Sequence, residues 1–174
     1  IAAGAIHAIF LDDNGRVYGC GYSEYGQLGL GDSVHAKTSK KYPQQINILN
    51  SSNITDISCG GNYSIFLTDT GEAYTCGIND SGQLGLGHKN IEYWPTLITS
   101  IETGDGNVYR SKNGFISSEC GYNYSIFLTD TGKAYSCGQN VNGELGLGDT
   151  IDKHIPTLIN FSNTTLCNGI FLRC

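Results

Sequence analysis

The sequence lacks the features that mark membrane proteins and nucleic-acid-binding proteins. No run of about 18 apolar residues is present, which predicts that no segment spans a membrane. We also expect no signal peptide within these residues. The ten Lys and Arg residues are scattered over a chain of net charge −6, whereas nucleic-acid-binding domains usually carry a basic stripe. We therefore expect neither membrane insertion nor direct binding of nucleic acid.

Motifs of known chemistry are missing as well. None of the four histidines stands with a Ser or Cys nucleophile in a recognisable motif. Acidic residues occur mostly in turns, such as Asp12–Asp13 and Asp69, and the spaced ligand set of a calcium-binding EF loop is absent. The seven cysteines include no CxxC pair, and zinc sites need ligands at short spacing. We predict no catalytic residue, no metal and no cofactor.

Five of the cysteines recur at matching positions of a repeat described below. They form two sets: Cys20, Cys76 and Cys137; and Cys59 and Cys120. Recurrent cysteine is typical of a small residue packed in a core, and an odd number of thiols without close pairs favours a reducing compartment. We expect an intracellular protein of the cytoplasm or nucleus, although three Asn-x-Ser/Thr sequons weakly favour secretion.

Glycine, by contrast, is abundant, with 24 residues, and much of it lies in one recurring motif. The motif reads GQLGLG at 26–31 and 82–87, and GELGLG at 143–148, so its copies start 56 and 61 residues apart. Residues 62–71 and 123–132 share the ten letters NYSIFLTDTG. This self-similarity shows an internal repeat, whose units must bury their apolar faces against one another. A phosphate-binding loop would need GxGxxG or GxxxxGK[ST], and neither spacing is present.

Each repeat has the pattern of an antiparallel sheet. Residues 63–68 predict a strand, residues 69–72 a tight turn and residues 73–77 a return strand. Both faces of these strands are apolar, as in a sheet packed between two others. Outer strands are predicted to open at a proline in each copy: Pro43, Pro95 and Pro156. The fold class predicted is all-β, with about three four-stranded antiparallel blades of a partial β-propeller.

The whole chain, 1–174, is predicted to be a single repeat domain. Repeat 1 covers about 1–56, repeat 2 about 57–116 and repeat 3 about 117–161, and a degenerate or truncated tail covers 162–174. Residues 104–107 are interpreted as an insertion at a loop tip. Since the chain opens inside the first repeat, we expect it to be part of a longer protein.

The opening residues, IAAGAIHAIFL at 1–11, resemble the signature of the regulator of chromosome condensation repeat family. The hairpin, the glycine motif and the later proline follow in that family's order over residues 1–160. His7 occupies the family's histidine position, which Tyr63 and Tyr124 take in the other copies. The resemblance implies four-stranded blades in a ring of about seven. Three blades cannot close such a ring, so either the parent protein has more repeats or copies associate through their open edges.

The resemblance implies two candidate functions. The first is a protein–protein interaction module that binds a protein partner through its loops. The second is guanine-nucleotide exchange on a Ran-like small GTPase, the activity of the family's founding member. We expect no counterpart of that member's basic tail within these residues. His7 would then be either a contributor to exchange or a structural histidine. The candidate partner-binding residues lie in three loops: Tyr22, Glu24 and Tyr25; Asn79 and Asp80; Asn140 and Asn142.

Overall fold

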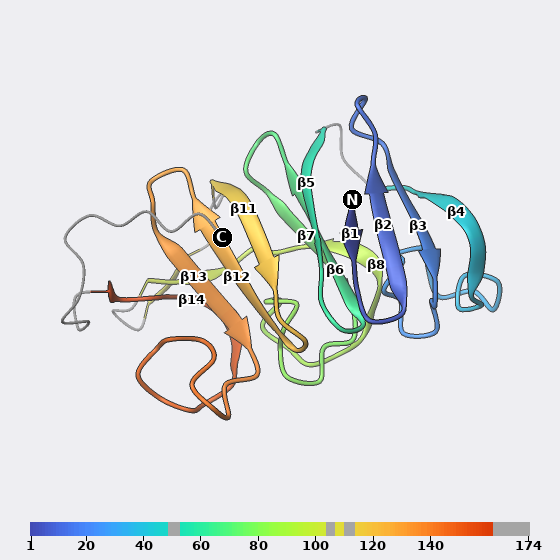
Figure 1. The fold of residues 1–174 in the computed structure, drawn as a ribbon. Helices are drawn as coiled ribbons and strands as arrows, with labels where there is room; N and C mark the ends of the chain where they lie inside the picture. The colour runs from blue at the N-terminus through green and yellow to red at the C-terminus, as the bar shows by residue number, and fades with distance from the viewer. Residues whose placement is uncertain (49–52, 104–106, 110–113, 162–174) are drawn as a thin grey trace.

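The computed structural model describes residues 1–48, 53–103, 107–109 and 114–161. Three antiparallel sheets stand side by side in chain order, and we call them blades 1, 2 and 3 (Figure 1). The row does not close into a ring, which leaves one face of blade 1 and one face of blade 3 at its two ends. The predicted fold, an all-β partial propeller, is confirmed.

The blades share one strand order, in which each strand pairs with its neighbour in sequence. Blade 1 contains β1 (Ala2–Ala3), β2 (His7–Leu11), β3 (Val17–Gly21) and β4 (Lys40–Ile46). Blade 2 contains β5 (Ile54–Cys59), β6 (Tyr63–Thr68), β7 (Ala73–Gly77) and β8 (Glu92–Leu97). Blade 3 contains β11 (Phe115–Cys120), β12 (Tyr124–Thr129), β13 (Ala134–Gly138) and β14 (Lys153–Leu158).

The third sheet also has two short strands from the connection between blades 2 and 3. They are β9 (Ile101–Glu102) and β10 (Val108–Tyr109), which pair with each other, and β9 then pairs in parallel with β14. The insertion predicted at 104–107 falls between them, and its residues 104–106 lie outside the described residues. The predicted tail at 162–174 also lies outside them.

The hairpin turns follow from local chemistry. In blade 1 the Asp12 carboxylate accepts hydrogen bonds from the backbone N–H groups of Asn14 and Arg16, each at 2.9 Å. Gly15 has a φ of 74°, in the left-handed region that glycine enters without steric cost. A short Asx turn followed by glycine therefore joins β2 to β3.

Alternate residues of each strand pack against opposite neighbours. In blade 2, Phe66, Tyr74 and Cys76 join the core shared with blade 1, whose residues include Ile9 and Leu28. A second core lies between blades 2 and 3 and contains the following residues of both: Ile65, Leu67, Ala73, Phe115, Phe127, Tyr135 and Cys137. The consecutive apolar residues of β6 are thus explained by a sheet that is buried on both faces.

The prolines lie inside the outer strands, contrary to the prediction that they open them. Pro43, Pro95 and Pro156 are the fourth residues of β4, β8 and β14. The register of each outer strand shifts next to its proline, for example between the pairs Gly19↔Gln44 and Gly21↔Lys40. Because the residues at an irregularity leave the regular ladder, the missing N–H of proline costs no ladder hydrogen bond there.

The glycine motif packs against the outer strand of the next blade. A Cβ added to Gly29, whose φ is 62°, would lie 2.9 Å from Pro95 Cγ, and one added to Gly85 would lie 3.0 Å from Pro156. Glycine at these positions therefore permits close approach between blades, and the motif is explained by blade packing.

Candidate protein-interaction face

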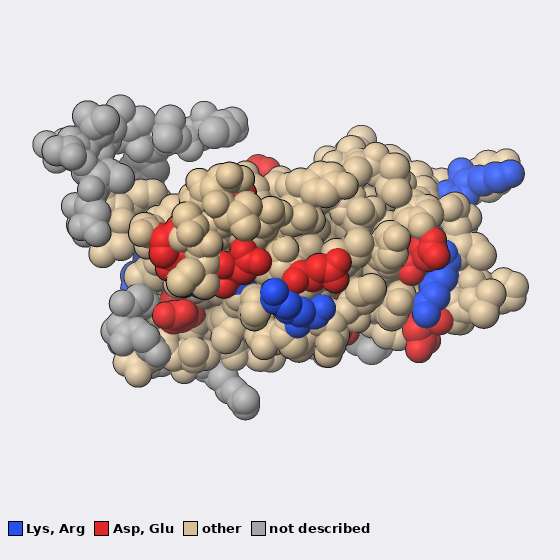
Figure 2. Space-filling view, turned by 90° about the horizontal axis from the view of Figure 1, so that it is seen from below, with Lys and Arg blue, Asp and Glu red and all other residues tan. Residues whose placement is uncertain are grey.

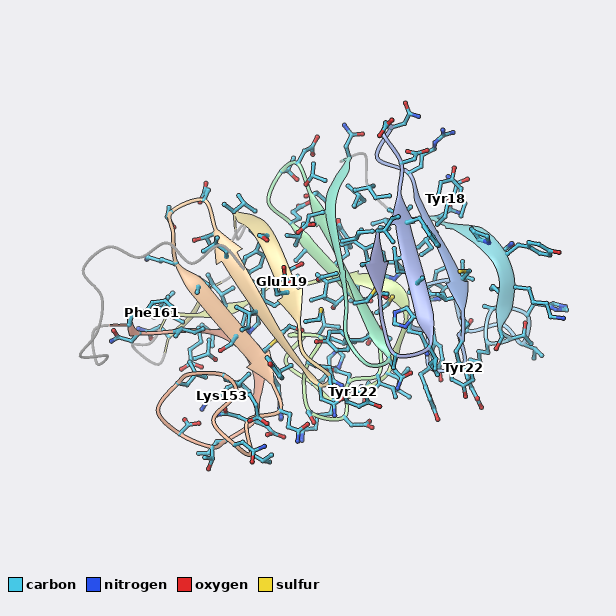
Figure 3. All side chains as sticks on the ribbon, in the orientation of Figure 1. Tyr18, Tyr22, Glu119, Tyr122, Lys153 and Phe161 are labelled. Atoms are coloured by element: carbon cyan, nitrogen blue, oxygen red, sulfur yellow. The ribbon has the colours of Figure 1, made fainter. Side chains whose placement is uncertain are left out.

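The three predicted loops lie at one end of the blades. Strands β3, β7 and β13 run in the same direction, and each is followed by one of these loops, at the lower side of Figure 1. We call this side of the molecule the loop end. Figure 3 shows both Tyr22 and Tyr122 at the loop end, although they belong to blades 1 and 3. The fold therefore brings the sequence-predicted loops to a common face.

A repeated backbone frame holds each loop. Equivalent turns are closed by N–H donation from Gly26 to Ser23 O at 3.1 Å, and from Gly82 to Asn79 O at 3.0 Å. The residue after each glycine then stabilises the turn, because its side-chain oxygen accepts a hydrogen bond from a backbone N–H of the same loop. Gln27 Oε1 accepts from Tyr25 N at 3.1 Å, Gln83 Oε1 from Ser81 N at 2.9 Å, and Glu144 Oε2 from Asn142 N at 2.8 Å.

Two of the predicted contact residues, Asn79 and Asn140, are fully buried. Asn79 Oδ1 accepts from Leu84 N at 3.0 Å, and its Nδ2 donates to His88 O at 2.8 Å. Asn140 makes the equivalent bond to Leu145 N at 2.9 Å and donates to Asp149. Both side chains are occupied in tying their loops to the glycine motif, so they shape the face without reaching a partner.

The blade 1 loop presents an aromatic and acidic cluster. The hydroxyl of Tyr22 donates a hydrogen bond to Glu24, and the Tyr22 and Tyr25 rings meet edge to face at 5.7 Å. The hydrogen bond to Glu24 raises the pKa of Tyr22 to about 12. Tyr25 and Glu24 are exposed, so both phenolic rings and the carboxylate can take part in contacts from the solvent side.

The equivalent loops of blades 2 and 3 present different groups. Asp80 and Asn142 are exposed, and Asn142 Nδ2 donates to Glu144 at 3.0 Å. Backbone N–H donors, including that of Asn142, hold the pKa of Glu144 below its usual value. Figure 2 looks onto this side of the molecule, where acidic side chains gather at several places and basic side chains lie beside only some of them.

The backbone of His7 lies at the loop end, paired with Gly21, but its side chain is not presented on that face. It is 5% exposed, inside the contact between blades 1 and 2, with Nε2 2.9 Å from Ser64 Oγ. The Ser64 hydroxyl has one proton, which it donates to Gln27 O at 2.7 Å. The hydroxyl must therefore accept from His7, which places the ring proton on Nε2. Burial lowers the pKa of His7 to about 4, against a smaller opposing effect of the Tyr63 backbone.

Sequence reasoning missed three exposed apolar residues at the loop end. Tyr122 is 66% exposed, Val141 57% and Ile6 53%. Tyr122 follows Gly121 at the position that Gly61 takes in blade 2, so the replacement of glycine by tyrosine in an otherwise matching segment was the available signal.

The cysteines that the structure describes are free thiols. Cys59, Cys76, Cys120 and Cys137 lie in the contacts between blades or next to them, whereas Cys20 is half-buried in blade 1 and belongs to neither contact. Burial raises the pKa of Cys59 to about 12 and that of Cys120 to about 11. It also raises the pKa values of Cys76 and Cys137 well above the ordinary thiol value. These thiols pack as small apolar groups. Within the described ranges no three His, Cys, Asp or Glu residues come close enough to hold a metal ion.

Comparison with known proteins identifies the repeat. The model of the regulator of chromosome condensation (RCC1) repeat matches residues 14–67, 70–128 and 131–168. These matches begin in the hairpin turns, so each one spans parts of two blades. Within the described ranges the structure has no helix that is long and apolar enough to cross a membrane.

Relatives of known sequence are much longer than this chain. The ultraviolet-B receptor UVR8 of Arabidopsis thaliana is 28% identical over 159 residues, which are 91% of this chain and 33% of the receptor. The human probable E3 ubiquitin-protein ligase HERC4 is 35% identical over 158 residues, 90% of this chain and 14% of the ligase. The chain thus spans a third or less of the length of these two relatives.

Solved structures show the same arrangement of blades. Prp20p of Saccharomyces cerevisiae superposes with a TM-score of 0.78 at 24% identity, over 94% of this chain and 38% of its own. Human WBSCR16 superposes with a TM-score of 0.70 at 26% identity, over 91% of this chain and 39% of its own. Three matched repeats and the shared blade architecture show that this chain belongs to the regulator of chromosome condensation (RCC1) repeat family.

Proposed function

We propose that this chain is a protein–protein interaction module and that its loop end binds the partner. One observation supports this most directly. The three equivalent loops share the same hydrogen-bonded frame, yet their exposed positions differ: Glu24, Asp80 and Val141 occupy one matching position. A constant frame with variable exposed side chains is how rigid scaffolds present binding loops.

The chemistry of the face favours a partner with cationic and apolar groups. Tyr22, Tyr25 and Tyr122 supply aromatic surface, and tyrosine is enriched at protein interfaces. Glu24 and Asp80 supply negative charge that would steer a Lys- or Arg-bearing surface. An intracellular location, in the cytoplasm or nucleus, forms part of the same proposal and is supported by the free thiols.

Guanine-nucleotide exchange on a Ran-like small GTPase is the second candidate. It rests on the family resemblance and on the likeness in fold to Prp20p, the yeast RCC1 protein. Binding properties of Prp20p to Gsp1p and to histones have been described. His7 contributes no exposed group to this activity, because its ring is enclosed between blades 1 and 2. In this second candidate we assign any exchange activity to the exposed residues of the loop end.

The interaction proposal is tested by quantitative capture of proteins from a cell extract on the immobilised chain. The triple variant Tyr22→Ala, Glu24→Ala and Tyr25→Ala should lose specific partners at least tenfold. The matched control is Asp13→Ala with Asn14→Ala, which changes the hairpin at the opposite end. Partners retained equally by both variants would remove the loop end from the binding role.

Exchange is tested separately by the release of a fluorescent guanine nucleotide from a purified Ran-type GTPase. Acceleration by the wild-type chain that the triple loop variant abolishes would establish the second candidate. An unchanged release rate at saturating chain concentration would exclude exchange by this chain and leave the capture experiment as the measure of partner binding.

A further inference from the structure

The loop that follows β3 differs chemically from its two counterparts in blades 2 and 3. It carries Tyr22, Glu24 and Tyr25. The matching positions hold Ile78, Asp80 and Ser81 in blade 2, and Gln139, Val141 and Asn142 in blade 3. Of the three loops, the one in blade 1 therefore combines two aromatic rings with a carboxylate.

The two rings and the carboxylate of this loop form an open corner. The hydroxyl of Tyr22 donates a hydrogen bond to Glu24 Oε2, and Glu24 Oε1 accepts no hydrogen bond from the described residues. The rings of Tyr22 and Tyr25 are inclined at 62° with their centroids 5.7 Å apart. In such an edge-to-face pair each ring keeps a face that the other ring does not cover. We call Tyr22, Glu24 and Tyr25 the blade 1 corner.

The backbone holds the blade 1 corner in place before any partner arrives. Tyr22 N donates to Ile6 O at 2.9 Å, and Tyr25 N donates to Gln27 Oε1 at 3.1 Å. Gln27 is fully buried, and its Nε2 donates to Asn62 Oδ1 of blade 2 at 3.3 Å. A site on a fixed backbone loses less conformational entropy on binding than a flexible loop does.

The accessibility of these positions does not depend on the place of blade 1 at the end of the row. Blade 2 is flanked by blades 1 and 3 (Figure 1). There Asp80 is exposed and Ile78 is half-buried, as Glu24 and Tyr22 are in blade 1. A preceding blade therefore leaves both positions accessible, and we expect the same of the blade 1 corner in a longer chain.

The chemistry of the blade 1 corner suits a cation that is both planar and a hydrogen-bond donor. Aromatic faces attract cations, and a free carboxylate oxygen accepts from an N–H donor. A guanidinium does both at once, because it stacks flat on a ring and donates from its edge. A lysine ammonium donates without stacking, and a quaternary ammonium has no N–H to donate and is bound by cages of aromatic rings.

We propose that the blade 1 corner binds an arginine side chain of the partner protein. The guanidinium stacks on the ring of Tyr25 and donates to Glu24 Oε1, while Tyr22 holds the carboxylate through Oε2. The negative net charge of the chain, −6, attracts such a cation as well. This inference rests on the proposed function, because it names the group by which the loop end recognises its partner.

The test is an NMR titration of the isotope-labelled full chain with blocked tripeptides. The arginine probe is acetyl-Gly-Arg-Gly-amide, and the matched probes carry lysine, citrulline or trimethyllysine at the central position. The arginine probe should shift the backbone amide signals of Glu24 and Tyr25 saturably in the millimolar range and leave the signal of Val141 in place. The lysine probe should bind about threefold more weakly, and the uncharged citrulline probe about tenfold more weakly.

Variants separate the two kinds of contact. Glu24→Gln keeps the side-chain size but removes the charge, so binding of the arginine probe should weaken about tenfold. Tyr25→Leu removes the ring and should weaken binding about threefold, whereas Tyr25→Phe keeps a ring and should bind as the wild type does. In blade 2, Ile78→Tyr combined with Ser81→Tyr completes a second corner around Asp80, whose signal should then respond to the arginine probe. The dispersion of the amide signals verifies that each variant folds.

The arginine site is refuted by any of four results. They are equal affinities for the arginine and lysine probes, tighter binding of the trimethyllysine probe, unchanged affinity in Glu24→Gln, and signals of Glu24 and Tyr25 that do not shift with the arginine probe. If the triple loop variant nevertheless loses the proteins captured from extract, the proposed function stands although the arginine site is refuted. Selective binding of the arginine probe, with capture that the triple variant does not change, would support the arginine site and refute the proposed function.

Discussion

Replacing His7 by tyrosine should remove much of the acid sensitivity of this fold. The pKa of His7 falls from 6.5 to about 4 on folding, mainly because burial penalises the charged ring. Between these two values the unfolded chain binds a proton that the folded chain does not bind. The free energy of unfolding therefore decreases as pH falls from 6.5 to about 4. At about 1.4 kcal/mol per pKa unit the full loss is about 3 kcal/mol.

Tyrosine is the matched replacement because the repeat itself uses it. Tyr63 occupies the equivalent position in blade 2, where its hydroxyl lies 3.1 Å from Ser125 Oγ and donates to the Tyr124 carbonyl. Gly4 leaves room for the ring of His7, as Gly60 does for that of Tyr63. His7→Tyr should thus keep a hydroxyl next to Ser64 without a group that titrates near neutral pH.

The assay is urea unfolding at pH 7.5 and at pH 5. From pH 7.5 to pH 5 the free energy of unfolding of the wild type should fall by about 2 kcal/mol more than that of His7→Tyr, since the titrating carboxylates are common to both chains. His7→Phe separates titration from hydrogen bonding. It should show the same shallow pH dependence but be about 1 kcal/mol less stable at pH 7.5, because Ser64 loses its donor. Equal losses for wild type and His7→Tyr would refute a neutral, buried His7.

Three further predictions concern single contacts of the fold and are measured by urea unfolding. Leu67→Ala should lower the free energy of unfolding by about 2–5 kcal/mol, since Leu67 is fully buried between blades. Leu128→Ala should lower it by less than about 1 kcal/mol at low chain concentration, because Leu128 is 40% exposed. Equal losses for the two variants would contradict the exposure of Leu128. Ser125→Ala should lower the free energy of unfolding by about 1–3 kcal/mol, because Gln83 O would lose its hydroxyl donor and keep only the longer contact from Cys137 Sγ at 3.6 Å. An unchanged midpoint would contradict the bond from Ser125. Asn79→Ala should lower the free energy of unfolding by a similar amount, because its hydrogen bonds to Leu84 and His88 are lost. Asp80→Ala should leave the free energy of unfolding unchanged. A larger loss with Asp80→Ala than with Asn79→Ala would contradict the burial of Asn79.

Local pattern was sufficient to predict the strands and turns of each blade. The hairpin of residues 63–77 depends on β-forming residues on both sides of a turn that contains Gly71, and these preferences act between near neighbours in sequence. The prolines show the limit of local reasoning. Their position at a register shift depends on how β8 pairs with β7, which the composition of the outer strand does not specify.

The sequence by itself determined the repeat, its antiparallel strands and its family, because self-similarity, alternation and glycine placement are written along the chain. Only the tertiary structure decided which side chains of those repeats are available to a partner. Asn79 and Asp80 are adjacent and equally polar, yet one is enclosed by the glycine motif and the other is exposed. His7 likewise depends on Ser64, 57 residues away. Burial and partner choice depend on the neighbouring blade, and that contact forms between residues far apart in sequence.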